Sequence, residues 1–147
     1  MNDKRIKTIS FIVFSVYILL VLKLTIFRSG VLYEERQLNL TLFSDLFLVY
    51  KNEGLRRFLW LFLGNIGWFV PFGFLLPTLL KKESFLRILV IGFMFSFAIE
   101  SLQFIFRIGV AELDDLILNT LGIAIGYLIY KLWLRYKNVR NGGKAQK

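Results

Sequence analysis

Residues 97–126 read FAIESLQFIFRIGVAELDDLILNTLGIAIG, an apolar stretch that nevertheless carries a glutamate, a glutamine, an arginine, two aspartates and an asparagine. In a water-soluble domain such side chains would face solvent. In a membrane, a lone ionised group near the bilayer centre costs at least about 2.5–3.5 kcal/mol. The fold therefore depends on whether the chain crosses a bilayer and on where these polar groups are sheltered.

The composition indicates a membrane protein. Of the 147 residues, 56% are hydrophobic and 17% aromatic, and soluble domains of this size have shorter apolar runs. A helix needs roughly 20 apolar residues to cross a hydrocarbon core about 30 Å thick. Four stretches reach this length: about 6–27, 58–80, 85–106 and 113–134. We expect an all-α membrane protein, a bundle of four transmembrane helices that forms one domain over residues 1–147.

The connections add detail to this bundle. Residues 28–57 form the one long loop, and its segment LTLFSDLFLVY is too short to span and predicts an interfacial or re-entrant helix. Pro71 should kink or locally break the second span, and Pro77 should help to end it. The first span resembles a signal peptide, but RSGVLYE after it offers no small-residue cleavage site, so we expect a retained helix.

Basic residues predict the orientation. The formal net charge is +9, with twelve Lys or Arg residues on the side of the termini and the second loop and six on the other side. By the positive-inside rule, both termini are expected in the cytoplasm of a multi-pass plasma-membrane protein. The basic tail, residues 135–147, then touches anionic lipid rather than nucleic acid.

The absence of histidine and cysteine limits the chemistry. The chain has none of either residue, which excludes Cys/His zinc sites, catalytic sets built on histidine or cysteine, and internal disulfides. We expect no metal and no cofactor.

The polar residues of the third and fourth spans form stripes. At about 100° per residue, one face of the third span collects Gly92, Ser96, Glu100, Gln103 and Arg107. One face of the fourth span collects Asp115, Asn119, Gly122 and Gly126. The short connection predicts that the two spans form an antiparallel hairpin. One register aligns polar groups with polar groups and small with small: Gln103 with Asp115, Glu100 with Asn119, Ser96 with Gly122, and Gly92 with Gly126. Small residues would then bring these two backbones together.

Asn65 of the second span should join the polar residues, because it lies about 10 Å below the outer helix end, at a depth similar to that of Glu100. We therefore predict a polar pocket in the outer half of the bilayer, with Arg107 as a counter-charge at its rim. The candidate ligand-binding residues are Asn65, Glu100, Gln103, Arg107, Asp115 and Asn119. Hydrogen bonding between helices alone would also account for Glu100 and Asn119. Asp114 is assigned mainly to capping its own helix.

Two spaced motifs resemble those of the VanZ-like family of small integral membrane proteins. The first comprises Gly64, Asn65, Phe69, Pro71, Gly73, Leu75, Leu76 and Pro77. The second comprises Glu100, Gln103, Gly109, Asp114, Asp115, Asn119 and Gly122. The resemblance covers residues 36–130 and departs at NLTLF (39–43), where family members often have a proline. It implies a role in resistance to teicoplanin-type glycopeptides and lipoglycopeptides, or in envelope homeostasis.

Three functions remain open from the sequence. The first, which we favour, is a binding protein whose pocket holds a membrane lipid, a lipid-linked envelope precursor or a lipoglycopeptide. The second is an enzyme on a lipid-linked substrate with Glu100 or Asp115 as general base, although no nucleophile is recognisable. The third is a small ion-coupled carrier. The sequence leaves open whether the chain forms a homo-oligomer.

Overall fold

The computed structural model describes residues 3–26, 32–80 and 84–142, and the elements are almost all helical. They are α1 (Asp3–Ile26), β1 (Gln37–Asn39), α2 (Ser44–Glu53), α3 (Leu55–Leu79), α4 (Phe85–Phe106), β2 (Val110–Glu112) and α5 (Leu113–Gly142). Four helices, α1, α3, α4 and α5, are long and apolar enough to cross a membrane. The prediction of an all-α bundle with four spans and a short helix in the first long loop is confirmed.

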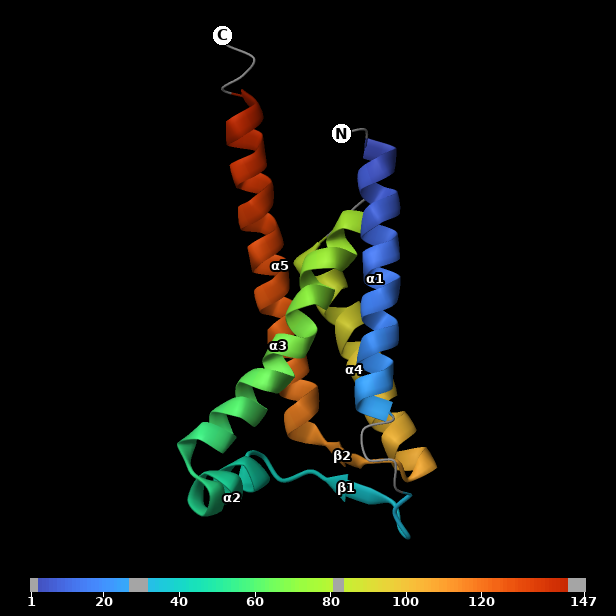
Figure 1. Cartoon of the computed structure of the whole chain (residues 1–147), viewed down its shortest axis with the longest axis vertical. Helices are drawn as coiled ribbons and strands as arrows, with labels where there is room; N and C mark the ends of the chain where they lie inside the picture. The colour runs from blue at the N-terminus through green and yellow to red at the C-terminus, as the bar shows by residue number, and fades with distance from the viewer. Residues whose placement is uncertain (1–2, 27–31, 81–83, 143–147) are drawn as a thin grey trace.

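The two ends of the bundle differ. The start of α1 and the end of α5 lie at one end, together with the end of α3 and the start of α4 (Figure 1). Helix α2 and the two strands lie at the opposite end (Figure 1), which is called the loop end below. This is the arrangement expected of an even number of spans.

Helix α3 has a first half that leans away from the other spans and a second half that packs against them. Its first half leans away from the bundle toward α2 (Figure 1), and every buried residue of the helix lies at or beyond Phe69. The helix is continuous through Pro71, so the proline does not break it. Pro71 lies where the leaning half meets the packed half, and a proline there bends a helix because its ring clashes with the preceding turn.

Helix α1 supports this turn of α3. The Tyr17 hydroxyl donates a hydrogen bond of 2.7 Å to the carbonyl oxygen of Trp68. Backbone groups near a proline in a membrane helix need partners from neighbouring helices. Phe14 packs edge-on against Phe72, with ring centroids 5.4 Å apart.

Aromatic rings hold the leaning half of α3 against α2. Tyr50 of α2 meets Phe58 of α3 edge-on at 6.0 Å, and Phe58 stacks on Phe62 at 5.6 Å. Gly54 joins the two helices with a φ of 86°, a conformation that glycine adopts without strain. The angle between α2 and α3 is therefore fixed by a glycine turn and a packed aromatic corner.

The small residues of α5 bring it against α3, not against α4 as the sequence register predicted. A Cβ atom on Gly122 would lie 2.2 Å from the Ile66 carbonyl oxygen, and one on Gly126 would lie 2.1 Å from that of Val70. In return, a Cβ on Gly73 would lie 2.0 Å from the Ile123 carbonyl oxygen. Helix α5 makes its most extensive contacts with α3. Close approach of two membrane helices through small residues maximises their van der Waals contact.

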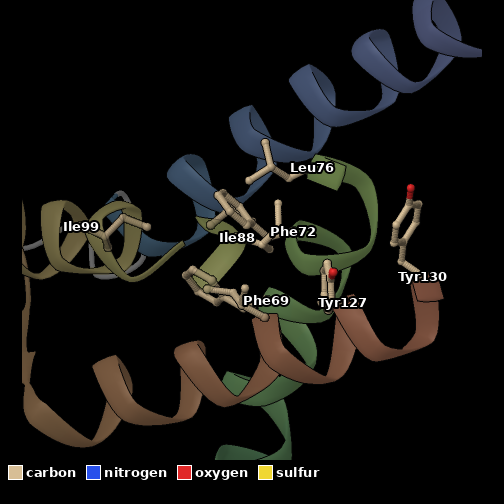
Figure 2. Packing of buried hydrophobic residues seen from close by; sticks show 9 residues of the cluster. Phe69, Phe72, Leu76, Ile88, Ile99, Tyr127 and Tyr130 are labelled. Atoms are coloured by element: carbon tan, nitrogen blue, oxygen red, sulfur yellow. The ribbon is translucent and has the colours of Figure 1, made fainter. Parts of the chain in front are cut away.

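The buried core lies where the four spans meet. Its residues are Val21, Phe69, Phe72, Leu76, Ile88, Ile99, Ile123, Tyr127 and Tyr130. Figure 2 shows Phe72, Leu76 and Ile88 gathered between α1, α3 and α4, with Tyr127 on the neighbouring turn of α5. Because these contacts fill the middle of the bundle and the end opposite the loop end, the loop end is where space remains.

The loop end is tied together by groups that the sequence did not predict. Strand β1 pairs in parallel with β2, and the Tyr33 amide donates a hydrogen bond of 2.8 Å to the carbonyl oxygen of Arg107. Asp114, only 2% exposed, accepts the Phe43 amide through both carboxylate oxygens at 2.9 Å. Its assignment to capping α5 was therefore incomplete, because it anchors the start of α2 and holds Phe43 at a φ of 54°.

Candidate functional site

A cavity of about 1310 Å³ lies at the loop end, where α3 leans away from the other spans. Its apolar wall comes from α1, α3 and α4: Val21, Leu24, Leu59, Trp60, Leu61, Leu63, Trp68, Phe69 and Ile99. Its polar lining includes Thr25, Glu53, Arg56, Arg57, Asn65, Glu100, Gln103, Asp115 and Asn119, and two glycines, Gly64 and Gly67, complete it. Trp60 is 73% exposed and Leu63 55% exposed. The cavity is thus continuous with the face of α3 that would meet lipid.

Asn65 and Asp115 are joined by a hydrogen bond at one end of the cavity. This end, which also includes Glu100 and Gln103, is called the cavity floor below. The Asn65 side-chain amide donates a hydrogen bond to the Asp115 carboxylate. Asn65 is placed by the leaning half of α3, and Asp115 by the first turn of α5. The sequence register had aligned Asp115 with Gln103 of the third span, whereas in the structure Asp115 accepts from Asn65 of the second span.

Glu100 is held by the backbone of β2. It is 8% exposed, and its Oε2 accepts the Glu112 amide at 3.0 Å. A carboxylate can accept several further hydrogen bonds. Glu100 therefore has one structural partner and additional acceptor capacity on the cavity side.

Asn119 pairs with Ser96 rather than lying level with Glu100. The Asn119 side-chain amide donates a hydrogen bond of 2.9 Å to the Ser96 hydroxyl, and both residues are buried. A Cβ atom on Gly92 would meet the Ile123 side chain at 2.4 Å, which gives the same offset between α4 and α5. The hairpin register is therefore slid by nearly one turn from the predicted one, because the connection contains strand β2 instead of a tight turn.

Gln103 has one satisfied end and one unsatisfied end. Its Nε2 donates 3.3 Å to the Thr25 carbonyl oxygen. Within residues 3–26, 32–80 and 84–142, its buried Oε1 has no hydrogen-bond partner. A Cβ atom on Gly109 would lie 3.1 Å from the Gln103 amide, so the glycine leaves room for this side chain. An acceptor buried without a partner costs about 1–3 kcal/mol, which a ligand that donates a hydrogen bond would recover.

Arg107 does not lie where the sequence placed it. It is absent from the cavity lining, and its Nη1 donates 2.9 Å to the Glu34 carbonyl oxygen. Its backbone ends α4 in the left-handed conformation, with a φ of 57°. Arg107 therefore fastens the end of α4 to the loop, and it is not brought together with the other five candidate residues, which all line the cavity.

The cations that do line the cavity are Arg56 and Arg57, at the start of α3. Arg57 forms an ion pair with Glu53 at 3.4 Å, with both side chains about half exposed. The sequence analysis counted both arginines only as loop charges. Arg57 lies eight positions before Asn65, about 80° away around the helix, and this spacing was the signal that could have found it, whereas Arg56, nine positions before, lies on the opposite side of the helix.

Gly64 and Gly67 face open space. A Cβ atom on either glycine would have no neighbour within 4 Å, in contrast to the glycines between α3 and α5. Glycine at these two positions therefore widens the cavity and serves no close helix contact. A larger side chain at either position would enter the cavity without disturbing the core.

The chemistry of the lining favours binding. Within the part of the chain that the structure describes, no group of three or more Asp, Glu, His or Cys residues could hold a metal ion. The floor includes the carboxylates of Glu100 and Asp115, whereas the amide oxygen of Gln103 is enclosed by protein atoms. Such a floor suits a ligand group with several hydroxyl or amine hydrogens, while the apolar wall suits a hydrocarbon chain.

Comparisons with known proteins agree with this membrane architecture. The family model described as VanZ/LLP1 matches residues 14–134. Protein VanZ of Enterococcus faecium is 33% identical over 106 residues, which are 72% of this chain. The chain spans 60% of the length of that relative. No solved structure matches the chain at a significant level. The extent of the family match shows that the chain belongs to the VanZ/LLP1 family.

Proposed function

We propose that this protein binds an amphiphile with a polar head group in the loop-end cavity, and that this binding contributes to glycopeptide or lipoglycopeptide tolerance or to envelope homeostasis. The observation that carries the proposal is the mixed lining. Acceptors lie on the floor, apolar side chains form the wall, and Trp60 and Leu63 continue that wall to the lipid-facing surface. A lipid, a lipid-linked precursor or a lipoglycopeptide would present both kinds of surface.

The polar floor supports binding over a purely structural role. Asn119 and Ser96 satisfy each other, as expected of hydrogen bonds that only join helices. Glu100 instead has one hydrogen-bond partner among the described residues and lies beside a large cavity, and the buried Gln103 oxygen has none there. Groups that served only to join helices would have been enclosed by their partners.

The resistance role rests on family membership. The resemblance to the VanZ-like family implies teicoplanin-type resistance, and the 33% identity to Protein VanZ supports carrying that role over. A shared fold can serve different functions, so the role needs a direct test. The distribution of basic residues supports placing the loop end outside the cell, where the cavity would meet the outer leaflet.

A variant that blocks the cavity tests the proposal directly. Gly67→Leu places an isobutyl group into open space at the lining, so the fold should remain intact. In a deletion strain complemented with this variant, tolerance to a lipoglycopeptide should fall to the level of the strain without the gene, at normal protein abundance. The matched control is Leu128→Phe, an enlargement on an exposed apolar position of α5 away from the cavity, which should complement fully.

Polar variants refine the result. Asp115→Ala should also abolish complementation, whereas Asn119→Ala, which leaves Ser96 without its partner, should lower complementation only by lowering protein abundance. Their abundance must be measured, because loss of one partner of a buried polar pair costs about 1–3 kcal/mol. Full tolerance with a normally abundant Gly67→Leu protein would remove the cavity from the function. Activity kept by Glu100→Gln would favour binding over acid–base or proton-linked chemistry.

A further inference from the structure

The charges that line the cavity differ between its two ends. The floor holds the carboxylates of Glu100 and Asp115 and the buried Gln103 oxygen. The lining cations, Arg56 and Arg57, lie at the other end of the cavity, in the first turn of α3. An anion at the floor would face the carboxyl groups of Glu100 and Asp115, whereas an anion at the start of α3 would meet two arginines and one carboxylate, Glu53.

The two arginines are not equivalent. Arg57 is paired with Glu53 at 3.4 Å. Within the residues that the structure describes, no ion pair involves Arg56. A guanidinium group without a carboxylate partner beside an apolar cavity suits a phosphate, to which it can donate two parallel hydrogen bonds. Arg56 is therefore the better candidate for contact with an anion.

The separation along the helix sets the size of the ligand head group. Arg56 precedes Asn65 by nine positions, or about 13 Å along α3 at 1.5 Å per residue, and lies on the opposite side of the helix at about 100° per residue. The arginine side chain itself covers part of this length. A bare phosphate at Arg56 would not reach the floor, whereas a phosphate that carries a further polar group could reach it.

Resting on the proposed binding function, we infer that the preferred ligand is a phosphodiester lipid whose head group carries hydroxyl or ammonium hydrogens. Its phosphate contacts Arg56, and its head group donates to the carboxyl groups of Asp115 and Glu100. Its acyl chains leave along Trp60 and Leu63, which are both cavity lining and exposed. Neither a phosphomonoester without a head group nor a neutral glycolipid satisfies both ends of the cavity.

The test is a competition among four lipids with identical acyl chains. Purified protein is incubated in mixed micelles with equal amounts of phosphatidic acid, phosphatidylglycerol, phosphatidylethanolamine and a neutral glucosyl diacylglycerol. It is then repurified, and the retained lipids are quantified by mass spectrometry. Phosphatidylglycerol, phosphatidylethanolamine or both should be retained about tenfold over the other two, because a hydrogen bond to a charged group is worth about 1.5–3 kcal/mol. Comparison of these two lipids distinguishes hydroxyl from ammonium recognition.

The variants identify the contact. Arg56→Gln should lower retention of the preferred phosphodiester about tenfold and leave the neutral glycolipid unchanged. The control is Arg36→Gln, which removes the same charge at the same end of the bundle. Arg36 lies over the Phe104 ring, 5.8 Å from its centroid, and outside the cavity lining, so this variant should match the wild type.

Failure of the inference and failure of the proposed function give different results. Equal retention of phosphatidic acid and the phosphodiesters, or equal effects of the two arginine variants, would overturn the inference while Gly67→Leu still excluded lipid. Unchanged retention of all four lipids by Gly67→Leu would instead show that lipid is not held in the cavity, and both proposals would fall.

Discussion

The contact between α3 and α5 can be tested by adding a single methyl group. In Gly126→Ala the new Cβ would lie 2.1 Å from the Val70 carbonyl oxygen, 2.9 Å from the Phe74 amide nitrogen and 3.0 Å from the Gly73 Cα. All three neighbours are backbone atoms, so no rotamer change can relieve the contact. The helices must separate until the shortest distance exceeds 3.0 Å, below which real Cβ atoms essentially never lie.

The expected magnitude combines two opposing effects. Overpacking a close contact costs about 1–3 kcal/mol, while replacing glycine with alanine in a helix recovers up to about 1 kcal/mol. We expect Gly126→Ala to lower the free energy of unfolding by about 1–2 kcal/mol. The matched control is Gly64→Ala in α3, where a Cβ has no neighbour within 4 Å, so only the helix propensity remains and stability should be unchanged or slightly higher.

Equilibrium unfolding in bicelles, followed by tryptophan fluorescence, measures both variants in the same lipid. The difference between them isolates the close approach of α3 and α5, because both exchange glycine for alanine within a spanning helix. If Gly126→Ala were as stable as Gly64→Ala, the two backbones would not be in contact, and the packing described for α5 would be wrong.

Three further outcomes are expected. Asp114→Ala should leave the Phe43 amide without its acceptor, cost about 1–3 kcal/mol and speed amide hydrogen exchange at Phe43; unchanged exchange would refute the anchoring role. Tyr17→Phe should remove the hydrogen bond to Trp68 and lower thermal stability by about 0.5–1.5 kcal/mol, whereas equal stability would show that the bond contributes nothing. A cysteine at Ser84 should react with a membrane-impermeant thiol reagent only after the cells are opened, and labelling of intact cells would reverse the orientation.

Apolar length predicted the spans because a bilayer imposes a simple physical requirement, and all four appear within a few residues of the expected limits. The cost of exposing polar groups to lipid also explains why Glu100 and Asn119, which the sequence placed away from lipid, are only 8% and 6% exposed. These inferences needed no knowledge of how the helices contact one another.

The helix register could not be predicted in the same way. Polar and small residues recur every three or four positions in both stripes. Two registers that differ by about one turn therefore fit the pattern equally well: the predicted one pairs Ser96 with Gly122, and the observed one pairs Ser96 with Asn119. The stripe pattern also does not say which helix faces Gly122 and Gly126. Strand β2 decides the offset, and a three-residue strand has no pattern that the sequence analysis could have recognised.

The position of Arg107 also differs from the prediction, for a related reason. Its position on the polar stripe suggested a charge at the cavity, but the left-handed turn at the end of α4 redirects the chain and its side chain toward Glu34. A stripe predicts direction only while the helix continues. Arg56 and Arg57 were overlooked because their contribution depends on the lean of α3, which is fixed by packing with α2.

Adjacent aspartates give the first turn of α5 two mechanical attachments. Asp114 grips the loop at Phe43, and Asp115 holds the cavity floor through Asn65. Consecutive helical residues point about 100° apart but share one stiff backbone. The two attachments are therefore mechanically coupled. A rotation of this turn that moves Asp115 toward a bound ligand must also pull on the loop at Phe43, and a force on that loop must change the direction of Asp115 at the cavity floor.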